Sequence, residues 1–326
     1  MKMWTRAWLA ACCGMALAQA PAPAIAQDFP NKPVRIVVPF GPGGANDMVA
    51  RALAEPLAAD LGQAVVVENR SGASTIIGAS AVARAEPDGY TLLLSGSSTY
   101  TVLPALKQGL PYDPVESFDL LAVVADLPMV LVARAQGNVA STPVLLQQAR
   151  SAPGKLTYGT YGVGSVTHLM GEIFAIAAKV DLTPVPYRGS SQVVTALLGS
   201  EVDVAPETLA ATLARIQSGD LRPLAVFGQE RVAQLPDVPT VAELGLPDAT
   251  FGGWIALALP KGTPTAARDR LAAALQRAMA SERVRQVLAQ AGMLPVFLPE
   301  APFRARVDHE IAAFRKVARQ ANIVLE

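Results

Sequence analysis

The segment PFGPGGAND, residues 39–47, separates an apolar, β-branched run from a stretch of helical periodicity. Residues 34–40 have the composition of a buried strand that ends in this glycine loop. Beyond the loop, apolar residues over 49–61 recur at the spacing of one helix face, and Pro56 predicts a kink or an interruption in that helix. A strand, a glycine loop and a helix in this order form the repeating unit of layered α/β folds.

A second segment, GVGSVTH at residues 162–168, repeats the same junction between a strand and a helix. Elsewhere, short β-branched runs alternate with longer amphipathic segments. The predicted strands cover residues 34–40, 64–68, 90–94, 121–124, 129–133, 156–159, 183–187, 202–205, 224–227 and 251–259. The pattern predicts an α/β protein with two lobes of similar size, each around a mainly parallel sheet flanked by helices.

The amino terminus has the order of charged and apolar residues that is typical of a secretory signal peptide. Lys2 and Arg6 precede an apolar run over 7–18 and then a stretch rich in Ala and Pro. The small residues at 24–26, AIA, predict cleavage that removes residues 1–26, with a second cut site after 18–20, AQA. Because no later segment approaches the length of a membrane-spanning helix, we expect a soluble protein in the periplasm.

Residues 9–12, LAAC, resemble the site at which bacterial lipoproteins are cut and acylated, but the apolar segment before Cys12 is too short for us to expect a lipid anchor. Cys12 and Cys13 are the only cysteines, so cleavage leaves no disulfide and no thiolate. It also removes two basic residues and no acid from 27 of each, which leaves 25 basic against 27 acidic residues. This balance excludes a basic surface for nucleic acid or for an anionic membrane.

Both glycine loops have the properties of an anion site. A helix that begins directly after a strand presents free N–H groups and the positive end of its dipole, and Gly43 and Gly44 let a ligand approach the backbone. The alternative is a plain glycine turn with Asn46 or Asp47 as the helix cap. Neither loop has the nucleotide fingerprint GxGxxG, because Asn46 and Thr167 occupy the third glycine position. ATP and NAD are therefore not expected, nor is any other cofactor.

Few residues are suited to catalysis or metal binding. The sequence has no GxSxG motif, and His168 and His309 are its only imidazole bases. Two distant histidines without cysteine do not predict a metal site. His309 lies among charged residues on the last predicted helix, whereas His168 either supports its loop or touches a ligand. Arg188 likewise has two interpretations, as a partner for a ligand anion or as a surface residue.

Several separate motifs resemble one known family over nearly all of the mature chain. They are PFGPGG with Asp47 and Arg51, VENRSGA at 67–73, PDGYT at 87–91, GVGS with His168 and Leu169, PYRG at 186–189, LPDVPT at 235–240 with Glu243 and Gly245, and Trp254. Their order resembles the Bug, or TctC-like, family of extracytoplasmic receptors of tripartite tricarboxylate transport systems. The resemblance implies a Venus-flytrap fold, with lobe 1 at 27–125 and 230–326 and lobe 2 at 126–229.

The resemblance also implies a monomer that holds a small carboxylate between two facing loops and serves the membrane subunits of a transporter. The ligand would be a di- or tricarboxylate, an acidic amino acid or an aromatic acid. Two stretches depart from the family pattern: STI at 74–76 stands where a further glycine pair is common, and PET at 206–208 is unusual. The expected ligand-binding residues are Phe40, Gly43, Gly44, Ala45, Asn46, Ser74, Thr75, Ser97, Ser98, Gly162, Val163, Gly164, Ser165, His168, Tyr187, Pro206, Glu207 and Thr208.

Two other functions are open on the same scaffold. A receptor could present its closed form to a membrane signalling protein instead of a transporter. An enzyme with His168 as its base would turn over the bound acid, whereas a receptor returns it unaltered. We expect a receptor without catalytic residues.

Overall fold

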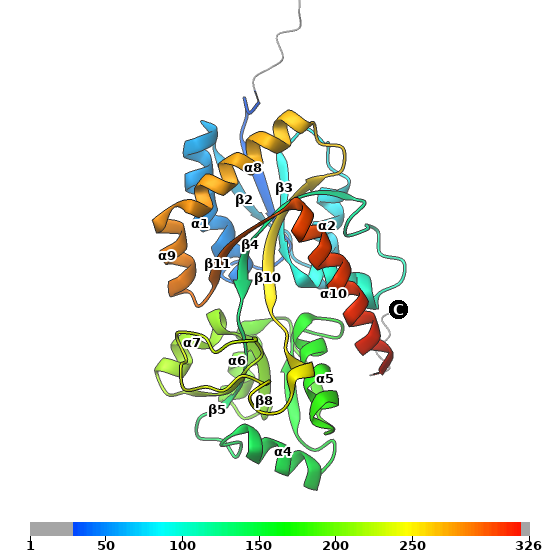
Figure 1. The fold of residues 1–326 in the computed structure, drawn as a ribbon, viewed down its shortest axis with the longest axis vertical. Coiled ribbons are helices and arrows are strands. Elements are labelled where there is room, and N and C mark those ends of the chain that lie inside the picture. The colour runs from blue at the N-terminus through cyan, green and yellow to red at the C-terminus, as the bar shows by residue number, and fades with distance from the viewer. Residues whose placement is uncertain (1–28, 321–326) are drawn as a thin grey trace, which may run out of the picture.

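Two separate β-sheets organise residues 29–320, which the computed structural model describes (Figure 1). The larger sheet has six strands in the order β11-β4-β10-β3-β1-β2. These strands are β1 (Val34–Val38), β2 (Val65–Asn69), β3 (Thr91–Gly96), β4 (Phe118–Leu127), β10 (Gly253–Pro260) and β11 (Leu294–Pro299). The helical segments of this half are α1 (Ala45–Leu61), η1 (Ala73–Thr75), α2 (Ile76–Ala83), the π-helical turn η2 (Ser98–Val102), α3 (Leu103–Leu106), α8 (Thr265–Ala280), α9 (Glu282–Gln290) and α10 (Glu300–Gln320).

The second sheet has five strands in the order β7-β6-β8-β5-β9. These strands are β5 (Met129–Arg134), β6 (Thr157–Thr160), β7 (Thr183–Pro186), β8 (Val204–Thr208) and β9 (Leu221–Val226). The helices of this half are α4 (Thr142–Ser151), α5 (Val166–Ala178), α6 (Ser190–Leu198), α7 (Leu209–Gln217) and the short η3 (Pro247–Ala249). The two lobes predicted from the sequence therefore correspond to two sheets, each with its own helices.

The sheets are mixed, so the prediction of mainly parallel sheets was wrong. Strands β1, β2 and β3 pair in parallel, as do β6, β7 and β8. In contrast, β10 is antiparallel to β3 and β4, and β5 is antiparallel to β8 and β9. The reason is that β4, β5 and β10 carry the chain between the halves and run against their neighbours.

The chain crosses between the sheets at two places, where β4 and β10 run from one half to the other (Figure 1). Pro128 alone separates β4 from β5. On the return, the N–H of Phe251 donates to the carbonyl of Phe227 at 2.7 Å, and Gly253 already pairs with Leu127 of β4. These hydrogen bonds favour a return near Gly252 over the lobe boundary at residue 230 that the sequence predicted.

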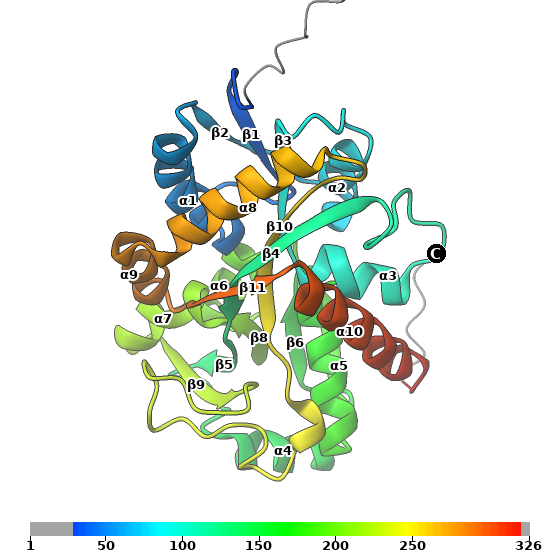
Figure 2. The ribbon, with the colours of Figure 1, turned by 45° about the horizontal axis from the view of Figure 1, so that its top comes forward.

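Hydrophobic clusters fill both faces of both sheets. Helices α1, α8 and α9 cover one face of the six-stranded sheet, and α2 and α10 cover the other. In the second half, α4 and α5 cover one face, and α6 and α7 the other. Helix α1 runs without interruption through Pro56. Helix α10 reaches the second half, where Phe314 packs on Phe251 with ring centroids 5.0 Å apart (Figure 2).

The carboxyl ends of the parallel strands face one another across the junction between the sheets. In the first sheet, Gly96 at the end of β3 lies opposite Ile255, close to the crossing. In the second sheet, Thr208 at the end of β8 lies opposite Met129, the first residue after the crossing. Because β1 and β2 run with β3, and β6 and β7 run with β8, all six strands end at the junction. Ligands of open α/β sheets bind at such ends.

The predicted signal peptide, with Cys12, lies outside the described residues. Among the helices between residues 29 and 320, none combines the length and the apolar composition that a membrane span requires.

Candidate functional site

The first glycine loop leaves the amino end of α1 open. Residues 41–44 (GPGG) are exposed, and Gly44 is the helix N-cap with no side chain in the capping position. The first helical hydrogen bond runs from Met48 N–H to Gly44 O at 2.9 Å. Within the described residues, the N–H groups of Ala45 and Asn46 therefore have no partner. A cap by Asn46 or Asp47, the alternative from the sequence, is not formed.

Asp47 fixes the conformation of this loop through hydrogen bonds. Its Oδ2 accepts hydrogen bonds from the N–H of Gly43 and from Nε of Arg51, both at 2.9 Å. Asn69 at the end of β2 donates to Oδ1 of Asp47 at 3.0 Å and to the carbonyl of Phe40 at 3.1 Å. Burial opposes ionisation of Asp47, but the hydrogen bonds from Arg51, Gly43 and Asn69 prevail and lower its pKa. The loop is thus shaped before any ligand arrives.

The segments after β2 and β3 lie beside the first loop. Ser74 is exposed, whereas the hydroxyl of buried Thr75 accepts a hydrogen bond from Thr99 at 2.8 Å. Ser97 is buried, and its carbonyl accepts from Thr101. Ser98 is half-buried at the start of η2. Of these four predicted residues, Ser74 and Ser98 present the most accessible surface.

The second loop satisfies more of its own polar groups than the first loop does. The N–H of Gly164 donates to Nδ1 of His168 at 3.2 Å, and the N–H of His168 donates to Oγ of Ser165 at 3.3 Å. The N–H of Tyr161 donates to Thr167 at 2.9 Å. Val163 projects from the tip with 56% of its surface exposed. This loop therefore offers a ligand an apolar tip and fewer free backbone N–H groups than the first loop.

His168 supports the second loop. It is buried and stacks on Tyr158, and its Nε2 lies 3.9 Å from Glu172. Burial lowers the pKa of His168, and the charge of Glu172 opposes this only in part. Of the two roles open from the sequence, the geometry favours support of the loop, and a contact with ligand stays a prediction.

Glu207 lies at the end of β8 with none of its surface exposed. The hydroxyls of Tyr161 and Ser190 both donate to its Oε2, the latter at 2.9 Å, whereas Oε1 has no hydrogen-bond partner. Burial raises the pKa of Glu207 to about 7, although these hydrogen bonds act in the opposite direction. Neither Tyr161 nor Ser190 was predicted; their positions directly after β6 and at the start of α6 were the available signal.

The other predicted residues of this half have structural partners. The N–H of Tyr187 donates to the carbonyl of Thr160 at 2.8 Å, and its hydroxyl lies 3.4 Å from Glu201. Thr208 caps α7 by accepting from Ala211 N–H at 3.2 Å, and Pro206 is buried in β8. Arg188 is exposed. Among residues 29–320, no group of His, Cys, Asp and Glu side chains is arranged to hold a metal ion.

Comparison with known proteins agrees with the motifs. Residues 49–321 match the sequence profile of the family described as tripartite tricarboxylate transporter family receptor. Protein BugT of Bordetella pertussis is 37% identical to this chain over 306 residues, which cover 94% of each protein.

Two solved structures share the fold. MatC from Rhodopseudomonas palustris with bound malate is 32% identical with a TM-score of 0.81, and the alignment covers 89% of this chain and 99% of that one. R. palustris Rpa4515 with adipate is 34% identical with a TM-score of 0.86, over 91% of this chain and 99% of that one. The two-lobe α/β fold and the resemblance seen in the motifs are thereby confirmed. This chain belongs to the receptor family of tripartite tricarboxylate transporters.

Proposed function

We propose that this chain is a periplasmic receptor that binds a small carboxylate between its lobes and delivers it, unaltered, to the membrane subunits of a tripartite transporter. The observation that supports this most is the uncapped start of α1 behind the exposed loop 41–44 (GPGG), at the junction where six strands end. The relatives MatC and Rpa4515 were solved with malate and with adipate, which are both dicarboxylates.

The amides of Ala45 and Asn46 would receive one ligand carboxylate. Free N–H groups and a helix dipole of about half a positive charge favour an anion at this place. Gly43 and Gly44 leave the approach open, because a Cβ at Gly44 would meet only the carbonyl of Gly41, at 3.9 Å. Backbone amides suit a receptor that must also release its cargo, since they add no full charge.

The opposite wall would be formed by the predicted residues after β6 and β7 and at the end of β8. Because the second loop satisfies most of its own amides, its contribution would be contact area, with Val163 at the tip. Two short crossing segments allow the lobes to rotate about the junction. His168 is a poor candidate for a catalytic base, since Nδ1 already accepts the Gly164 N–H and burial lowers its pKa.

A thermal-shift screen of the mature protein tests the proposal. The panel contains dicarboxylates, tricarboxylates, acidic amino acids, aromatic acids and nicotinate. A ligand at about a hundred times its Kd adds about 2.7 kcal/mol of stability, or roughly 5 °C in Tm. Mass spectrometry of recovered ligand should show it unchanged, because a receptor performs no turnover. If no acid raises Tm in protein that has been refolded to remove copurified ligand, the proposal fails.

Replacement of Gly44 by valine tests the carboxylate site. Gly44 has φ −83°, which any residue adopts, so Gly44→Val should leave Tm unchanged. Its side chain would cover the α1 amides, and we expect at least about a tenfold loss of affinity in calorimetry. Ala59→Val, on the exposed far end of α1, is the matched control and should bind normally. Equal affinity of Gly44→Val and wild type would place the carboxylate elsewhere.

A further inference from the structure

Two side-chain oxygens at the junction have no hydrogen-bond partner, although solvent does not reach them. One is Oε1 of Glu207 at the end of β8, and the other is Oδ1 of Asn46 in the first turn of α1. They belong to different lobes: Glu207 lies in the last residues of β8, and Asn46 follows the carboxyl end of β1. A buried acceptor without a donor is uncommon and costs stability. A hydrogen-bond donor that lies against either atom would remove this cost.

The groups around Glu207 show which hydrogen-bond partner its carboxyl lacks. Oε2 is fully used, since it accepts from Tyr161 and Ser190. The N–H of Thr208 also lies close to the carboxyl, and β5 places apolar Val130 opposite it. In the part of the chain that the structure describes, no Lys, Arg or His forms an ion pair with Glu207. The carboxyl therefore has one free acceptor and no cation of its own.

On the basis of the function proposed above, we propose that the ligand carries a hydrogen-bond donor, an ammonium or a hydroxyl group, next to a carboxylate, and that Glu207 and Asn46 accept from it. The α1 amides supply donors for the ligand carboxylate, and the two free oxygens supply acceptors for the neighbouring group. A plain diacid would satisfy the amides and leave both acceptors unpaired. Sites with buried polar groups discriminate strongly against ligands that leave those groups unpaired.

Matched acids that differ by one substituent test the proposal. Succinate, malate and aspartate share a carbon skeleton, and adipate with 2-aminoadipate repeats the comparison at greater length. Calorimetry should give at least about tenfold tighter binding for the member with the donor in one of these sets. Aspartate tighter than malate would identify the donor as ammonium, and the reverse order as hydroxyl. Equal affinities within both sets overturn the inference and leave the proposed function intact, whereas no binding of any acid overturns both.

Two variants test whether Asn46 and Glu207 cause the preference for the donor-bearing acid. Asn46→Ala removes one acceptor and retains the backbone amides, so the plain diacid should bind as before while the preference for the donor-bearing acid falls several-fold. Glu207→Gln removes the charge at nearly constant volume and should reduce a preference for ammonium by about tenfold. Glu282→Gln, on the exposed surface of α9, is the control. An unchanged preference in both site variants would mean that the donor group of the ligand contacts neither oxygen, which overturns the inference.

The pH dependence gives a readout that a merely structural role would not produce. The pKa of Glu207 is about 7, because of burial, and the other groups that face its carboxyl are Tyr161, Ser190 and the Thr208 amide. A ligand donor favours the ionised carboxyl, so binding should release a proton. Affinity for the donor-bearing acid, relative to the plain diacid, should therefore fall as pH is lowered from about 8 to about 6. A relative affinity that rises as pH is lowered would mean that protonated Glu207 donates to the ligand. A relative affinity that does not depend on pH would mean that Glu207 does not contact the ligand. Either result overturns the inference.

Discussion

At the scale of single residues, the segment after β2 contains three successive non-glycine residues with left-handed backbone. Ala73, Ser74 and Thr75 have φ values of 44°, 52° and 88°. L-residues pay about 1–2 kcal/mol for this conformation. The hydrogen bond from Thr99 to Thr75 helps to hold the segment in place. Ser74 and Thr75 belong to the stretch that departs from the family pattern, where glycine would be free of strain.

Ser74→Gly should relieve part of this strain. Because Ser74 is exposed, we expect a gain of up to about 1 kcal/mol in the free energy of unfolding, measured by urea denaturation. Ser71→Gly is the matched control, since Ser71 is exposed and has no positive φ. It should lose about 0.5–1 kcal/mol, because glycine only adds freedom to the unfolded chain. Similar losses in both variants would refute the account of strain.

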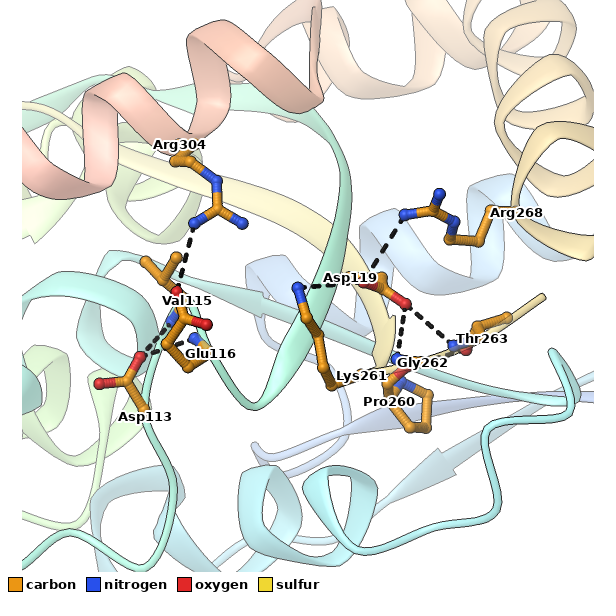
Figure 3. A network of polar contacts seen from close by, with 10 residues as sticks. All are labelled: Asp113, Val115, Glu116, Asp119, Pro260, Lys261, Gly262, Thr263, Arg268 and Arg304. Carbon is orange, nitrogen blue, oxygen red and sulfur yellow. Dashed lines mark hydrogen bonds and ion pairs between the residues drawn. The ribbon is translucent and has the colours of Figure 1, made fainter. Parts of the chain in front are cut away.

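At the scale of elements, one buried carboxylate joins β4 to the turn between β10 and α8 (Figure 3). Asp119 at the start of β4 accepts from the N–H groups of Gly262 and Thr263, both at 2.9 Å. Lys261 and Arg268 approach its other oxygen at 3.4 and 3.6 Å. Strands β4 and β10 both run from this contact to the junction between the lobes. The contact therefore holds together the ends of these two strands that lie farthest from the crossings.

Asp119→Ala should destabilise the protein by about 3 kcal/mol, because buried N–H groups and two cations lose their partner. Asp113→Ala is the comparison within the same view (Figure 3): Asp113 accepts from the N–H groups of Val115 and Glu116 in a more exposed turn. Its loss should cost only about 1 kcal/mol. Chemical denaturation measures the free energy of unfolding of both variants. Equal losses in the two would contradict the importance given to the Asp119 contact.

At the scale of the whole molecule, the lobes are linked by two crossing segments and by contacts of α10. Trp254 lies two residues after Gly252, but its surroundings belong to the first lobe. Its ring stacks on Tyr100 with centroids 5.7 Å apart, and Nε1 donates to both carboxylate oxygens of Glu310 at 2.9 Å. A rotation of the lobes as rigid bodies would leave these contacts unchanged.

Ligand binding should therefore change the fluorescence of Trp254 very little, although this is the only tryptophan once the predicted leader is removed. Phe251→Trp should give a clear signal, because residue 251 bonds to the second lobe and packs on Phe314 of α10. Emission spectra with a ligand found in the screen test both statements. A large change in wild-type emission would mean that the first lobe rearranges internally.

The local units of the fold were predictable from the sequence. The loops at 39–47 and 162–168 each join a strand to a helix in the structure, as periodicity and glycine content predicted. These features depend on near neighbours in the chain. The family followed from motifs in the correct order, whereas the choice between an uncapped helix start and a capped glycine turn required the structure.

The sequence by itself determined the glycine loops that join strands to helices and the order of these units, whereas only the tertiary structure showed that neither Asn46 nor Asp47 caps α1. Only the tertiary structure decided the mixed strand directions and the return near Gly252, because strand direction depends on pairing with distant strands. It also decided the environment of Glu207, whose partners Tyr161 and Ser190 lie 46 and 17 residues away in the chain. Burial and hydrogen bonding of a carboxyl are properties of the packed molecule, so no local pattern could reveal the acceptor that Glu207 leaves free.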